Sequence, residues 1–254
     1  MKIGAHVNPQ DPLGAAAERD AEAVQIFLAN PQSWKAPLPR TDADALKASD
    51  IDIYVHSPYL MNLASPNNRV RIPSRKTLAQ TVEAAEAIGA LGVIVHGGSV
   101  GDDEDVRVGY ERWRKALESF DVTVPILVEN TAGSGNSVMQ NIHNYGPLWE
   151  AIGDLNVGVC LDTCHTWAAG QDMENAVSLI NGLTGGVTLV HANDSRDEAG
   201  SNRDRHTNFS EGQIPEGLVA NIIREAGVTA IVETPDDDDG QAADIAYLRA
   251  RVVS

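Results

Sequence analysis

Short apolar runs alternate with longer segments of helical periodicity, and this pattern repeats about eight times along the chain. Most of the apolar runs are rich in Val and Ile and lack a polar face, which is typical of parallel strands covered on both sides. The runs predict strands at residues 2–7, 23–28, 51–56, 93–96, 126–129, 157–162, 187–191 and 230–233. Apolar positions recur at helical spacing between them, for example in 74–91 and 106–120.

Eight strand–helix units predict an α/β fold, an eight-stranded parallel (β/α)8 TIM barrel that forms one domain over residues 1–254. A doubly wound open sheet is the structural alternative. Neither a linker nor a low-complexity tract interrupts the pattern. The acidic run at 236–239 is interpreted as the solvated start of a helix.

From the third strand onward, almost every predicted strand ends in a side chain that can bind a metal ion. These residues are His56, His96, Glu129, Asp162, His191 and Glu233, and the following loops add His165, Asp204 and His206. In a barrel the C-terminal strand ends converge on one mouth, where active sites are built, whereas in an open sheet they lie in a row. One such histidine is usually a hydrogen-bonded structural residue. Nine residues at the same end favour a barrel with a metal site at that mouth.

The mixture of ligand types narrows the choice of metal. Imidazole combined with carboxylate suits zinc, iron or manganese, whereas magnesium and calcium prefer oxygen ligands alone. Five histidines and four carboxylates exceed one tetrahedral shell, so the set predicts two or three ions. Cys164 is expected to pack inside the protein and not to bind metal.

Composition predicts a soluble protein of the cytoplasm. Hydrophobic residues make up 43% of the chain, and no apolar stretch is long enough to predict a membrane span. Residues 1–6 form a strand pattern that lacks the zones of a signal peptide, and two cysteines suit a reducing compartment. The net charge of −17 argues against a nucleic-acid partner, unless bound cations reverse the local field.

Several segments closely resemble the endonuclease IV family. They are Gly4-Ala5-His6-Val7, His56-Ser57-Pro58-Tyr59-Leu60-Met61-Asn62-Leu63, Val95-His96-Gly97-Gly98-Ser99, Glu129-Asn130-Thr131-Ala132-Gly133, Cys160-Leu161-Asp162-Thr163-Cys164-His165, His191-Ala192-Asn193-Asp194-Ser195, Asp204-Arg205-His206 and Glu233-Thr234. The resemblance runs from Met1 to about Glu233. The Asp-Thr-Cys-His and Glu-Asn-Thr-Ala-Gly strings are its most specific parts, and all nine ligand positions carry the residue types that the family has.

The resemblance implies a trinuclear zinc site, in which manganese or iron is possible at one or more positions. It assigns His56, His96 and Glu129 to one ion and makes Glu129 a bridge to the second. The remaining ligands would be Asp162, His191 and Glu233 for the second ion, and His165, Asp204 and His206 for the third.

Such a site implies a hydrolase of DNA base excision repair that cuts duplex DNA on the 5′ side of abasic sites. A bridging hydroxide would attack phosphorus in line, and the products would carry 3′-hydroxyl and 5′-deoxyribose-phosphate ends. Glu129 and Glu233 would be the catalytic carboxylates. One barrel with one complete site is expected to act as a monomer, without an obligate protein partner or a membrane.

The sequence departs from the family at positions that bear on DNA binding and not on metal binding. Gln32 stands where an arginine is common, Gly97 where a proline is common and Ala192 where a leucine is common, and residues 207–212 differ. The candidate DNA contacts are Gln32, Tyr59, Leu60, Arg69, Arg71, Arg203 and Arg205. Tyr59 and Leu60 could enter the base stack or pack their loop, and the arginines could contact phosphates as part of a basic rim that also includes Lys35, Arg40, Arg75, Lys76 and Arg196.

Two other functions are open. A two-metal sugar isomerase or epimerase of the same barrel superfamily would use Glu129, Asp162, His191 and Glu233, but it would have no task for His165, Asp204 and His206. A non-catalytic, metal-dependent DNA-lesion binder would suit Gln32 and the negative charge, but the complete ligand set argues against it.

Overall fold

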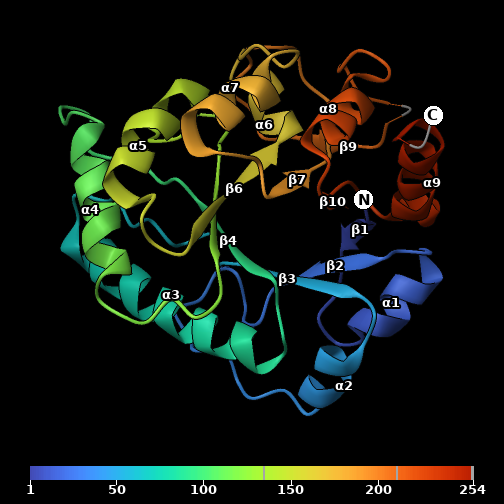
Figure 1. Ribbon diagram of the computed structural model, residues 1–254, viewed down its shortest axis with the longest axis horizontal. Helices are drawn as coiled ribbons and strands as arrows, with labels where there is room; N and C mark the ends of the chain where they lie inside the picture. The colour runs from blue at the N-terminus through green and yellow to red at the C-terminus, as the bar shows by residue number, and fades with distance from the viewer. Residues whose placement is uncertain (134, 210, 253–254) are drawn as a thin grey trace.

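Hydrogen-bonded pairing of β1 with both β2 and β10 closes the sheet on itself. The computed structural model describes residues 1–133, 135–209 and 211–252. Its eight parallel strands follow the order β1-β10-β7-β6-β5-β4-β3-β2 (Figure 1). Their bounds are β1 (Ile3–His6), β2 (Ala23–Ile26), β3 (Asp52–His56), β4 (Gly92–His96), β5 (Ile126–Glu129), β6 (Val157–Asp162), β7 (Leu189–His191) and β10 (Ala230–Val232). The predicted barrel is confirmed, and the open sheet is excluded.

Helices form a ring outside the strands, and both ends of the described chain lie on the same side of it (Figure 1). The helices are α1 (Pro12–Glu18), α2 (Ala43–Ala48), α3 (Asn68–Ala87), α4 (Arg107–Leu117), α5 (Tyr145–Ile152), α6 (Thr163–Ala168), α7 (Ala176–Thr184), α8 (Leu218–Ala226) and α9 (Gly240–Val252). The longest, α3, begins earlier than the sequence predicted because the Asn67 side chain caps it by accepting from the Arg69 amide. The acidic run forms the 3-10 turn η2 (Asp237–Asp239), which leads into α9.

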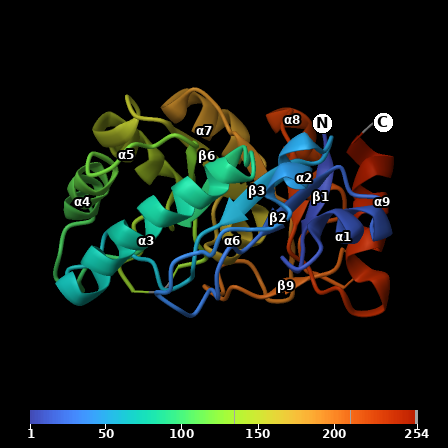
Figure 2. The ribbon, with the colours of Figure 1, turned by 90° about the horizontal axis from the view of Figure 1, so that it is seen from below.

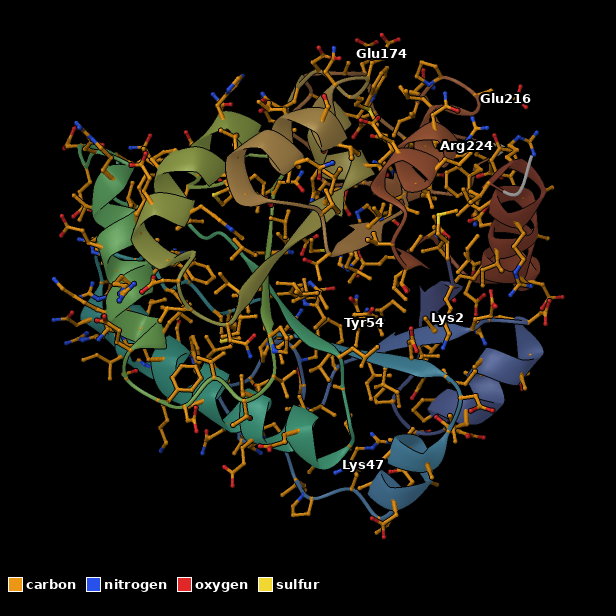
Figure 3. All side chains as sticks on the ribbon, viewed as in Figure 1. Lys2, Lys47, Tyr54, Glu174, Glu216 and Arg224 are labelled. Atoms are coloured by element: carbon orange, nitrogen blue, oxygen red, sulfur yellow. The ribbon has the colours of Figure 1, made fainter. Side chains whose placement is uncertain are left out.

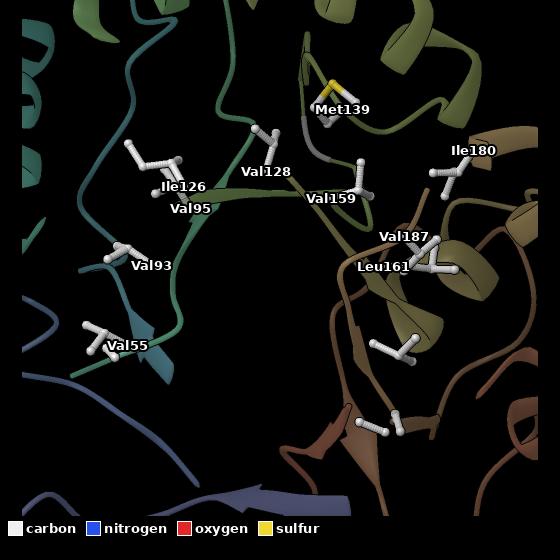
Figure 4. Packing of buried hydrophobic residues seen from close by; sticks show 14 of the residues in the cluster. Val55, Val93, Val95, Ile126, Val128, Met139, Val159, Leu161, Ile180 and Val187 are labelled. Carbon is white, nitrogen blue, oxygen red and sulfur yellow. The ribbon is translucent and has the colours of Figure 1, made fainter. Parts of the chain in front are cut away.

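Each strand buries two faces. Its outward side chains belong to the main hydrophobic core, of which Figure 4 shows the valines of β3, β4 and β5. Its inward side chains meet at the axis, where seven residues form a small apolar plug: Ala23, Tyr54, Ile94, Leu127, Cys160, Leu189 and Ile231. In Figure 3, Tyr54 lies at the barrel, whereas the charged residues Lys47, Glu174, Glu216 and Arg224 lie outside the helical ring.

Side chains alternate between the two faces of a strand with a period of two residues, so the residue two positions further along each strand also points inward. On every strand that residue is polar. We call these eight residues the inner polar ring. It comprises His6, Gln25, His56, His96, Glu129, Asp162, His191 and Glu233. Gly4 precedes His6 at the corresponding apolar position, and a Cβ there would lie 1.9 Å from the Ala23 carbonyl oxygen. Only glycine allows β1 and β2 to approach so closely.

A small hairpin that the sequence did not predict lies at the mouth, where its loop supplies Asp204. Strands β8 (Asp194–Ser195) and β9 (His206–Thr207) pair antiparallel and anchor the loop at 196–205 (Figure 2, where β9 is at the lower edge). Two-residue strands are too short to produce an alternating pattern, which explains the miss. Within the described ranges, no helix is long and apolar enough to cross a membrane.

Candidate metal centre

Glu129 lies at the centre of the inner polar ring and faces four imidazoles. Its Oε2 lies 3.1 Å from His96 Nε2 and 3.3 Å from His56 Nε2. The other nitrogen of His56, Nδ1, lies 2.7 Å from the Ser57 carbonyl and therefore donates to it. This bond leaves a lone pair on Nε2 that points toward the carboxylate. The ligand atoms of His56, His96 and Glu129 all lie within 4.8 Å of one another, which suits a shared cation.

A second group shares Glu129. His191 Nδ1 lies 3.0 Å from Glu129 Oε1, 3.2 Å from Glu233 Oε2 and 3.9 Å from Asp162 Oδ2. Glu129, Asp162 and His191 are fully buried, and Glu233 is nearly so. Because each oxygen of Glu129 faces a different group, this carboxylate is placed where it could join two cations.

A third group forms where the hairpin loop meets α6. Asp204 lies 3.2 Å from His165 Nε2 through Oδ2 and 3.1 Å from His206 Nε2 through Oδ1. His206 Nε2 is also 3.7 Å from Asp162 Oδ2. It is buried and has no aligned hydrogen-bond partner among the described residues, which fits a nitrogen that ligates metal. Cys164, expected to be a packing residue, is fully buried, with Sγ within 4.8 Å of ligand atoms of Asp204 and His206.

Three of the four carboxylates in these groups, those of Glu129, Asp162 and Glu233, are buried or nearly so, and positive charge must balance them. The fourth, Asp204, is about half exposed. Burial by itself raises the pKa of the Glu129 carboxyl, but the facing His96 and His191 hold that pKa well below its ordinary value. Burial likewise opposes charge on His165, His191 and His206, yet the negative groups around them raise each pKa well above that of free imidazole. Protons or metal cations can supply this charge, and the mixed nitrogen and oxygen donors suit zinc, manganese or iron.

Side chains behind the ligands orient them. Asn130 Nδ2 donates to the Asp162 carbonyl, and Asn130 Oδ1 accepts from the Asp162 amide at 2.8 Å. Asn193 Nδ2 donates to Asp162 Oδ2 at 2.8 Å, while Asn193 Oδ1 accepts from the Glu233 amide at 2.7 Å. These bonds hold the backbone of Asp162 and of Glu233 and one carboxylate oxygen of Asp162, as outer partners do in metal sites.

The structure therefore brings together all nine residues that the sequence singled out as ligands, and it adds two to the ring that the sequence analysis missed. Gln25 is the one polar residue in the run Ala-Val-Gln-Ile, and this interruption of an apolar strand was the available signal. His6 ends β1 at the position that corresponds to the other strand-end residues.

Two adjoining cavities open onto the groups. One of about 320 Å³ and one of about 230 Å³ share four lining residues, Tyr59, His96, His165 and Asp204. Tyr59 is 56% exposed at the rim, and its ring lies 5.5 Å from the His56 ring. Partial desolvation and the nearby carboxylates of Glu233, Glu129 and Asp204 raise the pKa of Tyr59 to about 12, so the hydroxyl remains protonated at neutral pH. Leu60 beside it is 37% exposed.

The candidate DNA contacts differ in how free their side chains are. Gln32, Arg69, Arg203 and Arg205 are exposed. Arg71 is half-buried, and its guanidinium donates to the Ser65 carbonyl and to the Asn68 side chain. Arg40, part of the proposed basic rim, is bound to Asp42 and to the Pro9 carbonyl.

Gly97, which stands where the resemblance leads one to expect proline, has a local explanation. Its amide donates to the Glu129 carbonyl at 3.1 Å, a bond that proline cannot make. A Cβ at Gly97 would lie 2.3 Å from Cγ of the buried Met139. The departure thus leaves the ligands His96 and Glu129 in place.

Three comparisons place this geometry among known proteins. The family model described as a xylose isomerase-like TIM barrel matches residues 13–251. The protein "Probable endonuclease 4" of Mycobacterium bovis BCG is 56% identical over 254 residues, 100% of each chain. The crystal structure of endonuclease IV from Thermus thermophilus has a TM-score of 0.86 at 28% identity and covers 100% of this chain and 99% of that one. A D-tagatose 3-epimerase-like protein shares the fold, with a TM-score of 0.81 at 21% identity over 100% of this chain and 98% of that one.

Proposed function

This chain belongs to the endonuclease IV family of xylose isomerase-like TIM barrels, and we propose that it hydrolyses duplex DNA on the 5′ side of abasic sites with three zinc ions. The products would be a 3′-hydroxyl end and a 5′-deoxyribose-phosphate end. Manganese or iron in place of zinc at one position would be compatible with the same ligands.

The observation that carries the proposal is the third ligand group. Asp204 draws His165 and His206 to within 3.2 Å and 3.1 Å of its carboxylate, directly beside Asp162 of the second group. A sugar isomerase with two metals needs only Glu129, Asp162, His191 and Glu233, and would leave this group without a task. In phosphodiester hydrolysis this third group would hold a metal ion that neutralises the charge on the leaving oxygen.

The ligand residues have separable tasks in this reaction. Zinc ions held by the three groups would lower the pKa of a water molecule to about 7 and neutralise the phosphate. Glu129 and Glu233 would orient the attacking water, whose proton would pass to solvent. The bond between phosphorus and the 3′ oxygen of the upstream nucleotide would break. The metal ion held by His165, Asp204 and His206 would stabilise the negative charge on that leaving oxygen.

The rim of the site supports a DNA substrate. Tyr59 and Leu60 project beside the cavities, where they could fill the gap left by a displaced abasic nucleotide. The exposed Arg69, Arg203 and Arg205 would contact phosphates. Gln32 would replace the charged contact of an arginine with a neutral one, so duplex binding should be weaker but should depend less steeply on salt.

The test is cleavage of a duplex that carries one tetrahydrofuran abasic analogue, with and without prior chelation. Because the analogue cannot undergo β-elimination, a chelator-sensitive nick on its 5′ side that leaves an extendable 3′-hydroxyl supports hydrolysis. Glu129→Gln should abolish the nick, and the matched control Glu174→Gln, on the outside of the helical ring, should retain it (Figure 3). Specific binding of the analogue without a nick would refute hydrolysis and indicate a lesion binder. Loss of both would redirect attention to sugar isomerisation.

A further inference from the structure

Two members of the inner polar ring, His6 and Gln25, have no task in the proposed reaction. Gln25 is fully buried at the middle of β2, and its side chain lies between two predicted ligands and His6. We infer that Gln25 is a positioning residue, which sets the ring nitrogen that His191 offers to metal and holds Glu233 in place. This inference rests on the proposed function, because it names a residue that supports the same metal site.

The contacts of Gln25 determine the direction of each hydrogen bond. Its Nε2 lies 2.6 Å from Glu233 Oε1, and an ionised carboxylate only accepts, so the amide nitrogen must donate. An inverted amide would place two oxygens at this distance and is excluded by their repulsion. Consequently Gln25 Oε1 is the atom that lies 2.8 Å from His191 Nε2.

This direction fixes the proton of His191. Because an amide oxygen only accepts, His191 must carry its proton on Nε2 when it bonds to Gln25. In the metal-bound state the lone pair would then be on Nδ1, the nitrogen that faces Glu129 at 3.0 Å and Glu233 at 3.2 Å. A metal-binding histidine needs such a partner for its other nitrogen, which sets the tautomer and the ring orientation.

The second N–H of the same amide reaches a second histidine. Gln25 Nε2 lies 2.8 Å from His6 Nδ1, which must accept because the amide nitrogen cannot. The His6 proton is therefore on Nε2. His6 lines the cavity of about 230 Å³ together with His56, His96 and Glu233, so it offers that cavity a hydrogen-bond donor. One buried amide thus orients a predicted carboxylate ligand, a predicted imidazole ligand and a donor in the substrate cavity.

Gln25→Met tests this role, since methionine keeps the length and most of the volume of glutamine but offers neither donor nor acceptor at the amide position. Loss of an outer partner weakens metal binding or activity by about 10-fold to 100-fold. We therefore expect the zinc ion bound with His191 to be lost at a chelator concentration lower by that factor. Zinc held with His165, Asp204 and His206 should be retained as in the unmodified protein.

Gln241→Met is the matched control. Gln241 is 5% exposed, lines the same cavity and donates to the backbone carbonyls of His6 and Thr234, but within the described residues it makes no hydrogen bond to a predicted ligand side chain. Both variants would be checked for a cooperative thermal transition, and their zinc content would be measured after dialysis against graded chelator. Unchanged zinc retention in Gln25→Met, or equal loss in both variants, would overturn the inference.

A measurement on the unmodified protein keeps the test valid if Gln25→Met does not fold. In the zinc-loaded protein, ¹⁵N NMR of the histidine rings should locate the His191 proton on Nε2, and a proton on Nδ1 would overturn the inference. If the abasic duplex is not cut although zinc retention and the His191 proton are as expected, the proposed function fails and the positioning role stands. If the abasic duplex is cut but the His191 proton is on Nδ1, the proposed function stands and the positioning role fails.

Discussion

Glu129→Gln is the substitution that tests the metal centre most directly. The change keeps the shape of the side chain and removes one negative charge from a group that four imidazole nitrogens face. Their distances to the two Glu129 oxygens lie between 3.0 and 3.3 Å. The residue is fully buried at the end of β5, so no other side chain can take its place without movement of the strand.

The expected magnitude follows from the two groups that share this carboxylate. Loss of an outer partner alone weakens metal binding by up to about 100-fold, and loss of a ligand to two ions should cost at least this. With metal well above its dissociation constant, a 100-fold loss of affinity removes about 2.7 kcal/mol of stabilisation by bound metal. For a domain of this size, that corresponds to a fall in melting temperature of roughly 5–11 °C.

The assay is thermal unfolding with excess zinc and again after chelation, for the unmodified protein, Glu129→Gln and the exposed control Glu174→Gln. The difference between the zinc-loaded and chelated melting temperatures should shrink in Glu129→Gln and remain in the control. Zinc per chain should fall in parallel. If Glu129→Gln kept the full difference and its complete zinc content, the reasoning that Glu129 joins two ions would be refuted.

The remaining predictions concern packing and pH. Trp113→Phe should destabilise the fold by about 1–3 kcal/mol in chemical denaturation, because the buried Gly97 carbonyl loses the Trp113 indole donor at 2.9 Å; a change near zero would contradict this. Gly4→Ala should cost about 1–3 kcal/mol or more, since the added methyl group meets the Ala23 carbonyl, and normal stability would show that β1 can shift. Zinc affinity, measured by competition with a chelator, should fall as pH falls, because protons compete for His165, His191 and His206, whose pKa values are raised. In the chelated protein the raised pKa of these histidines stabilises the fold fully below about pH 6.5, and this contribution should be lost as pH rises through the raised values; a melting temperature that does not fall from about pH 6.5 to about pH 9 would contradict it.

The sequence was sufficient to predict the barrel because its apolar runs and helical segments repeat without interruption. Strands β5 and β6 have the predicted bounds, since Glu129 and Asp162 end apolar runs sharply. The convergence of the nine candidate ligands could be predicted because strand ends converge in any barrel. Gln25 could not be assigned in the same way. Its meaning depends on the closure of β1 against β10, which brings Glu233 next to β2 across a sequence separation of 208 residues.

The basic rim also depends on tertiary contacts that the sequence alone does not show. Sequence position placed Arg40 and Arg71 near the mouth, but the fold uses their guanidinium groups to hold nearby loops. Fewer free cations therefore remain to attract DNA to a chain with a net charge of −17.

The four carboxylates of the metal centre would themselves repel a phosphate, and protonated histidines would only partly offset them. The three divalent ions that we propose would add six positive charges to these four negative ones and so would reverse the sign of the field at the mouth. Metal would then be required for DNA to approach the site as well as for the chemistry within it. An acidic surface elsewhere on the barrel is then compatible with a DNA substrate, because attraction and reaction depend on the same ions.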